Sequence, residues 1–315
     1  MGGIKNIFVS RALGRAGWIA TFDFVIWGAE LHLRKSRVAR REAPYCKIFA
    51  VLTLSQSMFY WFGSQTLRIV EGIGDFSLFT ARAFCALAKS KRLMRRIFSA
   101  VHEQGTVCMP VILIVGLFTG MVLGLQGSHV LSRFGSQGLL GTLVSLSLVR
   151  EMGPVLAALM LIGQAGSALA AELGIQRNTE QIVALETMGV NSHGYLVAPR
   201  LIAAMLVFPL QTAVFVVIGF WGGSLSGSLL LGVDSGVYWS AVQRAVEFQD
   251  MRECFIKSAA FGFLSISTCA YQGYHSDRNA SAMGARAVSA STTRAVVFSS
   301  ILVLVADYII SSFFV

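Results

Sequence analysis

Two adjacent charged residues, Arg150 and Glu151, stand inside an apolar run, and Lys257 and Asp307 stand inside later ones. A charged side chain is costly in apolar surroundings, so it is retained there by an opposite charge or by the chemistry it performs. Arginine holds anionic groups through a planar guanidinium that is always charged. These four residues are therefore the candidate functional residues, and Arg150 is the one that we expect to contact an anionic group.

Other kinds of site lack the residue spacing that they need. The five cysteines and five histidines are scattered, and no CxxC, HxxxH or HExxH occurs, so we expect neither a metal site nor a cofactor in this chain. No GxxxxGK[ST] or GxSxG occurs either, so the chain has no ATP-hydrolysing apparatus of its own. The net charge of +10 is accompanied by no nucleic-acid-binding motif, and we expect no nucleic-acid partner.

Long windows without charge indicate that the candidate residues are carried by membrane-spanning helices. The 315 residues are 55% hydrophobic and 13% charged, whereas a soluble domain has about 25% charged residues. No Asp, Glu, Lys or Arg occurs at 104–132, 201–233 or 258–276, and a helix needs roughly 20 apolar residues to cross a bilayer. We predict an all-α, polytopic integral membrane protein with five transmembrane helices preceded by interfacial helices.

The five spans are expected at 106–126, 139–163, within 196–232, at 251–271 and at 295–314. With this layout the strong basic clusters share one side, which predicts a cytoplasmic location for that side and an outer location for the C-terminus. Residues 1–71 are expected to form an N-terminal extension of interfacial or re-entrant helices, at 18–33 and 46–63. Residues 72–315 form the membrane domain, which opens with a further interfacial helix at 72–88.

The depths of the four charges follow from counting residues along these spans. Arg150 lies about eleven residues from the outer end, or roughly 16 Å deep, and Lys257 lies roughly 9 Å deep. Asp307 also lies about 9 Å from the outer face in a core of about 30 Å. We therefore predict that Lys257 and Asp307 pair, for structural or functional reasons that both remain open. For Arg150 and Glu151 the functional interpretation is favoured over a purely structural one.

A polar helix at 167–189 separates the second and third spans on the cytoplasmic side. Gly189 provides its C-terminal stop, and Asn178 or Thr179 could cap a restart of the helix after Gly174. A plain connector needs only a handful of residues, and the acidic excess of this helix disfavours adsorption to the bilayer surface, where Lys and Arg are preferred. We expect it to dock on a cytoplasmic protein. The residues assigned to this docking are Glu172, Arg177, Glu180, Glu186 and Gly189.

Two further features are expected to govern helix packing. Gly116, Gly120 and Gly124 are spaced by four, which places them on one face of the first span and lets another backbone approach closely. Pro154 follows the charged pair and stands between it and the polar helix, so we expect it to act as a hinge.

A series of motifs in order resembles the MlaE/YrbE family of ABC-transporter permeases over about 72–315. These motifs are GLFTGMVLGLQG (116–127), SLVREMGPVLAAL (147–159), GSALAAELG (166–174), TEQIVALETMGV (179–190), PRL (199–201), GGSLSG (222–227) and TTRAVV (292–297). The chain departs from the family in its first 60 or so residues, which extend beyond the usual N-terminus, and at Gln164, where the family often has Arg.

The resemblance implies the permease subunit of an ABC transporter in the inner membrane, working as a homodimer. Implied partners are two ATPase subunits that bind the ATP, an MCE-domain lipid-binding protein and in many cases a STAS-domain protein. Phospholipid or another lipid would be moved between the inner membrane and the outer envelope. The helix around 172–188 would be the coupling helix on the ATPase, and Arg150 and Glu151 would lie near the lipid cavity. The alternatives are a carrier or channel without a motor and an integral-membrane enzyme acting on lipids.

Overall fold

The computed structural model describes residues 63, 66–67, 70–85, 93–232, 234–278 and 284–314. Contacts divide the chain into two units, Met1–Gly72 and Ile73–Val315, and the second carries every feature discussed below. The helices expected at 18–33 and 46–63 lie outside the described residues, apart from Gly63. In the part of the chain that is described, every regular element is a helix, and one covers residues 70–85.

Five helical stretches in the described residues are long and apolar enough to cross a membrane, so the chain is an all-helical multi-pass membrane protein. The first stretch is α4 (Leu93–Arg133). The second is a continuous run of η1 (Gln137–Leu139), α5 (Leu140–Ser147), η2 (Leu148–Met152), α6 (Gly153–Leu161), η3 (Ile162–Gly166) and α7 (Ser167–Asn178). The third is η4 (His193–Val197) with α9 (Ala198–Leu231). The fourth and fifth are α11 (Phe248–Tyr274) and α12 (Ala285–Phe314).

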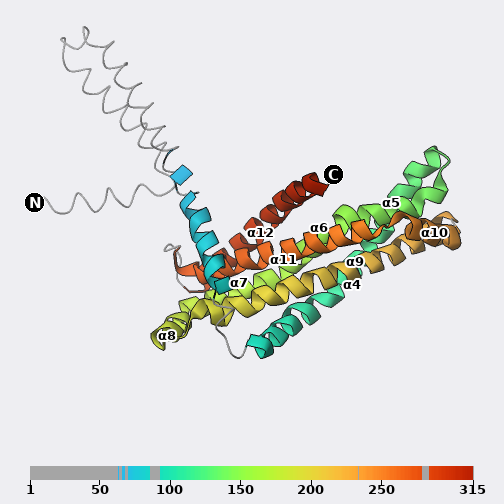
Figure 1. Ribbon diagram of the computed structural model, residues 1–315. Helices are drawn as coiled ribbons and strands as arrows, with labels where there is room; N and C mark the ends of the chain where they lie inside the picture. The colour runs from blue at the N-terminus through green and yellow to red at the C-terminus, as the bar shows by residue number, and fades with distance from the viewer. Residues whose placement is uncertain are drawn as a thin grey trace, which may run out of the picture. The chain divides into compact units, whose positions relative to one another are not determined.

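The short helices mark the two ends of this bundle (Figure 1). Helix α8 (Gln181–Thr187) joins the second and third stretches, and α10 (Ser235–Ala245) joins the third and fourth at the opposite end. We call these the α8 end and the α10 end. Asp234 caps α10 by accepting a hydrogen bond from the Gly236 amide, and α10 is followed closely by the first turn of α11.

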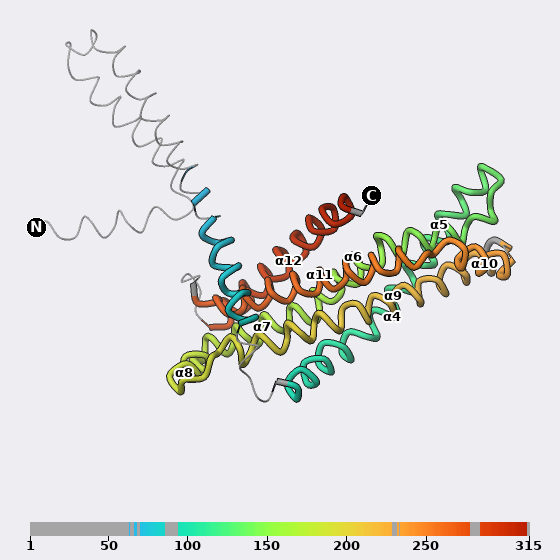
Figure 2. The backbone as a smooth tube through the Cα atoms, viewed as in Figure 1, coloured from blue at the N-terminus to red at the C-terminus, as the bar shows by residue number. Residues whose placement is uncertain are grey.

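Helices α4 and α9 run side by side along the bundle (Figure 2), and the glycine stripe lies between them. A Cβ atom at Gly120 would stand 2.0 Å from the carbonyl oxygen of Gly219, and one at Gly116 would stand 3.0 Å from the carbonyl oxygen of Phe215. Gly124 faces Gly223 in the same way, at 3.1 Å. The spacing of the three glycines therefore matches a backbone-to-backbone contact that any side chain would prevent.

The polar stretch predicted at 167–189 is two helices, and the restart that the sequence allowed after Gly174 falls at Glu180. Helix α7 continues from the membrane through Gly174, and the chain breaks at Glu180, whose φ of 59° is left-handed. Neither expected cap operates, because the Asn178 amide donates to the Gly174 carbonyl and the Thr179 hydroxyl to the Ile175 carbonyl. Gly189, with φ of 76°, ends the α8 segment as predicted. Docking residues expected on one helix are consequently divided between α7 and α8.

Three π-turns interrupt the second and third stretches, at η2, η3 and η4. Each adds a residue to a helical turn and so rotates the side chains around it, and such turns are frequent at functional sites. Each also carries a residue that lines a cavity: Arg150 on η2, Gln164 on η3 and His193 on η4.

Candidate functional site

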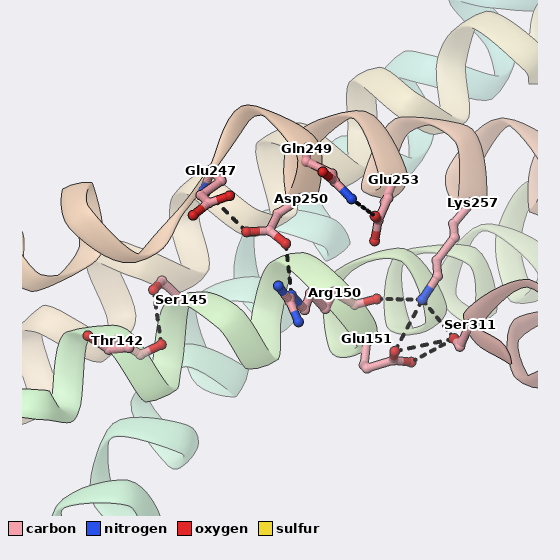
Figure 3. Close-up of polar contacts among 10 residues, drawn as sticks. All are labelled: Thr142, Ser145, Arg150, Glu151, Glu247, Gln249, Asp250, Glu253, Lys257 and Ser311. Atoms are coloured by element: carbon pink, nitrogen blue, oxygen red, sulfur yellow. Dashed lines mark hydrogen bonds and ion pairs between the residues drawn. The ribbon is translucent and has the colours of Figure 1, made fainter. Parts of the chain in front are cut away.

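A charged cavity of about 300 Å³ lies toward the α10 end, between η2, the first turns of α11 and the last turns of α12. Figure 3 shows its polar contacts. Its lining residues are Arg150, Glu151, Glu247, Gln249, Asp250, Glu253, Lys257 and Ser311. Three of the four charges singled out in the sequence thus share one cavity, and the fourth, Asp307, lies within ion-pair distance of Lys257.

Lys257 is the centre of the cluster, with only 4% of its side chain exposed. Its Nζ donates to Ser311 Oγ at 2.8 Å and to Glu151 Oε1 at 3.1 Å. The predicted pair with Asp307 is present, with 3.8 Å between Nζ and Oδ1, but Glu151 is the nearer carboxylate. Ser311 donates in turn to Glu151 at 3.2 Å, so a hydroxyl on α12 joins the ammonium to its counter-ion.

The third donor of the Lys257 ammonium is directed to the main chain, and Pro154 is the reason that an acceptor is available there. In an α-helix the amide of residue 154 would bond to the carbonyl of residue 150, but proline has no amide hydrogen. The freed Arg150 carbonyl accepts from Lys257 Nζ at 2.8 Å. Pro154 therefore supplies the acceptor for a buried cation as well as beginning α6.

The Arg150 guanidinium turns away from Lys257 and toward the α10 end. Its Nε donates to Asp250 Oδ1 at 2.8 Å, and Asp250 is 4% exposed whereas the arginine side chain is 56% exposed. Asp250 and Glu247 form the capping box of α11. Asp250 precedes Lys257 by seven residues, or about 10 Å along the helix, so the guanidinium bound to Asp250 lies nearer the α10 end than Lys257 does. The predicted order of depth, in which Arg150 is deeper than Lys257, is therefore wrong.

The order differs in part because α11 begins at Phe248, before the span predicted at 251–271, which places Lys257 farther from the α10 end. Side chains of η2 and α11 both lean toward that end, and the long Arg150 side chain in addition extends its charge toward water. The acidic lining was not singled out from the sequence, because Glu247 and Asp250 precede the span predicted at 251–271 and Glu253 stands in its first turn. The spacing of seven between Asp250 and Lys257 is the signal that could have revealed a shared helix face.

Four carboxylates on Glu151, Glu247, Asp250 and Glu253 therefore face two cations across the cavity. Lys257 is buried and saturated with acceptors, while Arg150 is exposed and, among the described residues, has one carboxylate partner. Arg150 is consequently the cation available to an incoming anionic group, and the surplus of carboxylates can hold a cationic group beside it.

A second polar cluster ties α8 to the rest of the bundle. Glu186 on α8 accepts hydrogen bonds from Tyr274 at 2.7 Å and from Ser192 at 2.8 Å, and these two hydroxyls hold the pKa of its carboxyl below the usual range. Arg177 on α7 donates to Asp277 at 2.8 Å. Of the predicted docking residues, Glu186 and Arg177 therefore attach the α8 end to the end of α11.

Glu172 lies elsewhere, in an ion pair with Arg200 at the start of α9. Together with Gln164 it lines a separate cavity of about 160 Å³ beside η3, which we call the η3 cavity. Glu180 occupies the left-handed break between α7 and α8. Within the described ranges no three His, Cys, Asp or Glu side chains converge to hold a metal ion.

Comparison with known proteins gives a consistent set of matches. A family model described as "Permease MlaE" matches residues 97–313. The "Probable ABC transporter permease protein" of Rickettsia bellii is 38% identical over 80% of this chain and 95% of its own length. The "Intermembrane phospholipid transport system permease protein MlaE" of Haemophilus influenzae is 38% identical over 79% and 94%. The chloroplastic "Protein TRIGALACTOSYLDIACYLGLYCEROL 1" of Arabidopsis thaliana is 30% identical over 72% and 64%.

Proposed function

The chain belongs to the MlaE permease family, and from this membership we propose that it moves phospholipids or related lipids between the inner membrane and the outer envelope as the membrane-spanning subunit of an ABC transporter. The relative from Haemophilus influenzae is named as a component of a phospholipid transport system. The cargo is a phospholipid, and the charged cavity between η2, α11 and α12 is where its headgroup passes.

The observation that carries this proposal is the exposed apolar surface of the α8 segment. Val183, Met188 and Val190 are 42%, 69% and 37% exposed at the tip of the α8 end, beyond the spans, where no lipid tail would cover them. The chain has no P-loop of its own. This surface is the docking site of a separate ATPase, which binds and hydrolyses the ATP, and the α8 end is accordingly the cytoplasmic end.

The orientation of the chain follows from the cytoplasmic α8 end. The chain crosses the membrane five times from the start of α4 to the end of α12, so the last residues of α12 lie in the periplasm if α4 begins in the cytoplasm. The proposed assembly pairs this chain with a second copy of itself and two ATPase subunits. An MCE-domain lipid-binding protein completes it at the α10 end, and a STAS-domain protein joins it on the cytoplasmic side.

In this function Arg150 binds the lipid phosphate. Its side chain is more than half exposed, and its guanidinium exchanges Asp250 for the phosphate, since both are oxyanions that an Arg fork fits. Lys257, held by three protein acceptors, keeps the cavity assembled while Arg150 moves.

The first test is whether an ATPase docks on α8. The full chain, co-expressed with a candidate P-loop ATPase from the same genome, should copurify with that ATPase in equal numbers. Met188→Asp should remove the ATPase, because a carboxylate replaces an apolar contact at the centre of the surface. Phe134→Asp is the matched control, since Phe134 is 75% exposed at the opposite end of the bundle. A chain that never retains an ATPase in mild detergent would overturn the proposal.

The second test measures ATP-driven lipid transfer from vesicles that contain the whole complex. Arg150→Glu should abolish transfer and leave complex assembly intact, whereas Arg133→Glu, an exposed arginine outside the cavity, should have little effect. Because Arg150→Glu also leaves Asp250 without its cation, the double variant Arg150→Gln with Asp250→Asn serves as a second probe and should likewise be inactive. Normal transfer in both variants would contradict the assignment of Arg150.

A further inference from the structure

The η3 cavity, at the α8 end, has a polar lining for which neither the charged cavity nor the docking surface provides a role. It lies between α4, the segment of η3 and α7, and the first turn of α9. Its polar residues come from all three: Glu103 and Gln104 from α4, Gln164 and Glu172 from η3 and α7, and Arg200 from α9. Gln164 owes its position to the π-turn η3.

Three buried polar atoms in this lining have no hydrogen-bond partner among the described residues: Gln104 Oε1, Gln164 Oε1 and Arg200 Nη1. Gln104 is 6% exposed, and its Nε2 donates to the Arg200 carbonyl at 3.3 Å, so only its carbonyl oxygen is left for the cavity. Arg200 gives Nη2 to Glu172, which leaves Nη1. Buried polar atoms without partners are costly, and three around one cavity indicate that something polar fills it.

The unsatisfied atoms define what that group must offer. Two amide oxygens require hydrogen-bond donors, one guanidinium nitrogen requires an acceptor, and Glu103 and Glu172 outnumber Arg200 in charge. An ammonium has three donors and one positive charge, and a phosphate is the usual partner of Arg. We propose that the cavity binds the phosphoethanolamine headgroup of a phospholipid, with the ammonium on Gln104 and Gln164 and the phosphate on Arg200.

Other headgroups fit the same atoms less well. A choline carries the positive charge but has no N–H donor for the two amide oxygens. A glycerol headgroup has hydroxyl donors but no cation, so its phosphate brings an uncompensated negative charge to a lining that is already negative. The cavity therefore selects lipids that carry a primary amine. This inference rests on the proposed function, since it makes the cavity a loading site for lipid at the α8 end.

The size and surroundings of the cavity require the acyl chains to lie outside it. A volume of about 160 Å³ corresponds to about five waters at roughly 30 Å³ each, which admits a headgroup and excludes a lipid tail. Val107, at the mouth, is 68% exposed, and the same helix exposes Ile114, Phe118 and Val122 toward the bilayer middle. The tails follow this apolar face of α4.

A photoreactive residue at the mouth would identify the bound lipid. We suggest p-benzoylphenylalanine at Val107 in the full chain, placed in vesicles of equal parts phosphatidylethanolamine and phosphatidylglycerol, with the crosslinked lipid identified by mass spectrometry. Phosphatidylethanolamine adducts should exceed phosphatidylglycerol adducts about tenfold, the effect of one charge-assisted hydrogen bond. Gln164→Arg should abolish this preference, because its cation occupies the place of the ammonium.

Gly163→Arg is the matched control, since it adds the same charge one residue away, where a Cβ atom meets nothing within 4 Å. It should keep the preference. If Gln164→Arg does not fold, Gln164→Leu removes the acceptor without a charge and should give the same loss. Adducts that match the bulk composition in the unsubstituted chain and in Gly163→Arg would show annular contact only and overturn the proposal.

Two further arms separate the possible sources of a failure. Complete competition by millimolar glycerophosphoethanolamine, which has no acyl chains, would assign the cavity to a soluble phosphodiester and overturn the lipid assignment. ATP-driven transfer that persists without the adduct preference would remove this cavity from the pathway and leave the proposed function intact. The reverse result, a preference without transfer, would support the cavity and contradict the proposed function.

Discussion

At the scale of single residues, Lys257 holds the charged cavity together. Its ammonium is buried against Glu151, Ser311 and the Arg150 carbonyl, with Asp307 at 3.8 Å. Lys257→Met should lower the free energy of unfolding by about 1–3 kcal/mol, because the half-exposed Glu151 and the partly buried Asp307 lose their cation. Thermal unfolding in detergent measures this loss. Adding Glu151→Gln and Asp307→Asn should restore most of it, and a triple variant as unstable as Lys257→Met would contradict the electrostatic explanation.

The same cluster shows how far individual residues could be read from the sequence. Ionisable residues inside apolar runs identified Arg150, Glu151, Lys257 and Asp307, because such residues are rare enough to be conspicuous. Asp250 and Ser311 were missed for opposite reasons: one stands at a helix start beside other charges, and the other is an ordinary small polar residue in a span. The hydrogen bond from Lys257 to the Arg150 carbonyl could have been predicted only from Pro154. This proline stands four residues after Arg150 and has no amide hydrogen to donate to that carbonyl.

At the scale of elements, the contact between α4 and α9 depends on the absence of a side chain at Gly120. Gly120→Ala should destabilise the protein by about 3 kcal/mol, because the added Cβ would stand 2.0 Å from the Gly219 carbonyl oxygen and force the helices apart. The melting temperature in detergent provides the measurement. Gly163→Ala is the control, as a Cβ there meets open space, and equal losses in both variants would disprove the packing argument.

Attachment of α8 should depend on pH through Glu186. Hydrogen bonds from Tyr274 and Ser192 lower the pKa of this carboxyl from its ordinary 4.5, so they stabilise the folded state fully above about pH 4.5. That contribution is lost as the pH falls through the lower pKa of the folded state. Hydrogen exchange of the α8 amides, corrected for intrinsic rates, should therefore accelerate on acidification. In Glu186→Gln the pH dependence should vanish, and its persistence would assign it to another group.

At the scale of the whole molecule, the sequence was sufficient for the class and number of spans and insufficient for their ends. Long apolar runs locate the middle of each span, because the bilayer imposes that composition. Helix ends are set by water, caps and neighbours instead, so α4, α11 and α12 all extend beyond their predicted limits. The helix restart was expected with Asn178 or Thr179 as its cap, whereas the chain breaks at Glu180, because a left-handed glutamate carries no compositional signal.

The two ends of the molecule communicate, in the proposed transporter, along the continuous stretch from α5 to α7, and Pro154 is where that stretch meets the charged cavity. Pro154→Ala restores an amide that can bond to the Arg150 carbonyl, the acceptor now used by Lys257. The π-turn η2 should then tighten into an α-turn and rotate Arg150 away from the cavity. We expect lipid transfer to slow about tenfold, as for the loss of one hydrogen bond to a charged group, with ATPase binding and basal ATP hydrolysis unchanged.

Transfer assays and copurification on the same preparation measure the rate of lipid transfer and the binding of the ATPase. Pro209→Ala, within α9, controls for the general effect of removing a proline from a span. If Pro154→Ala releases the ATPase, or leaves transfer at its normal rate, motion does not pass through this turn.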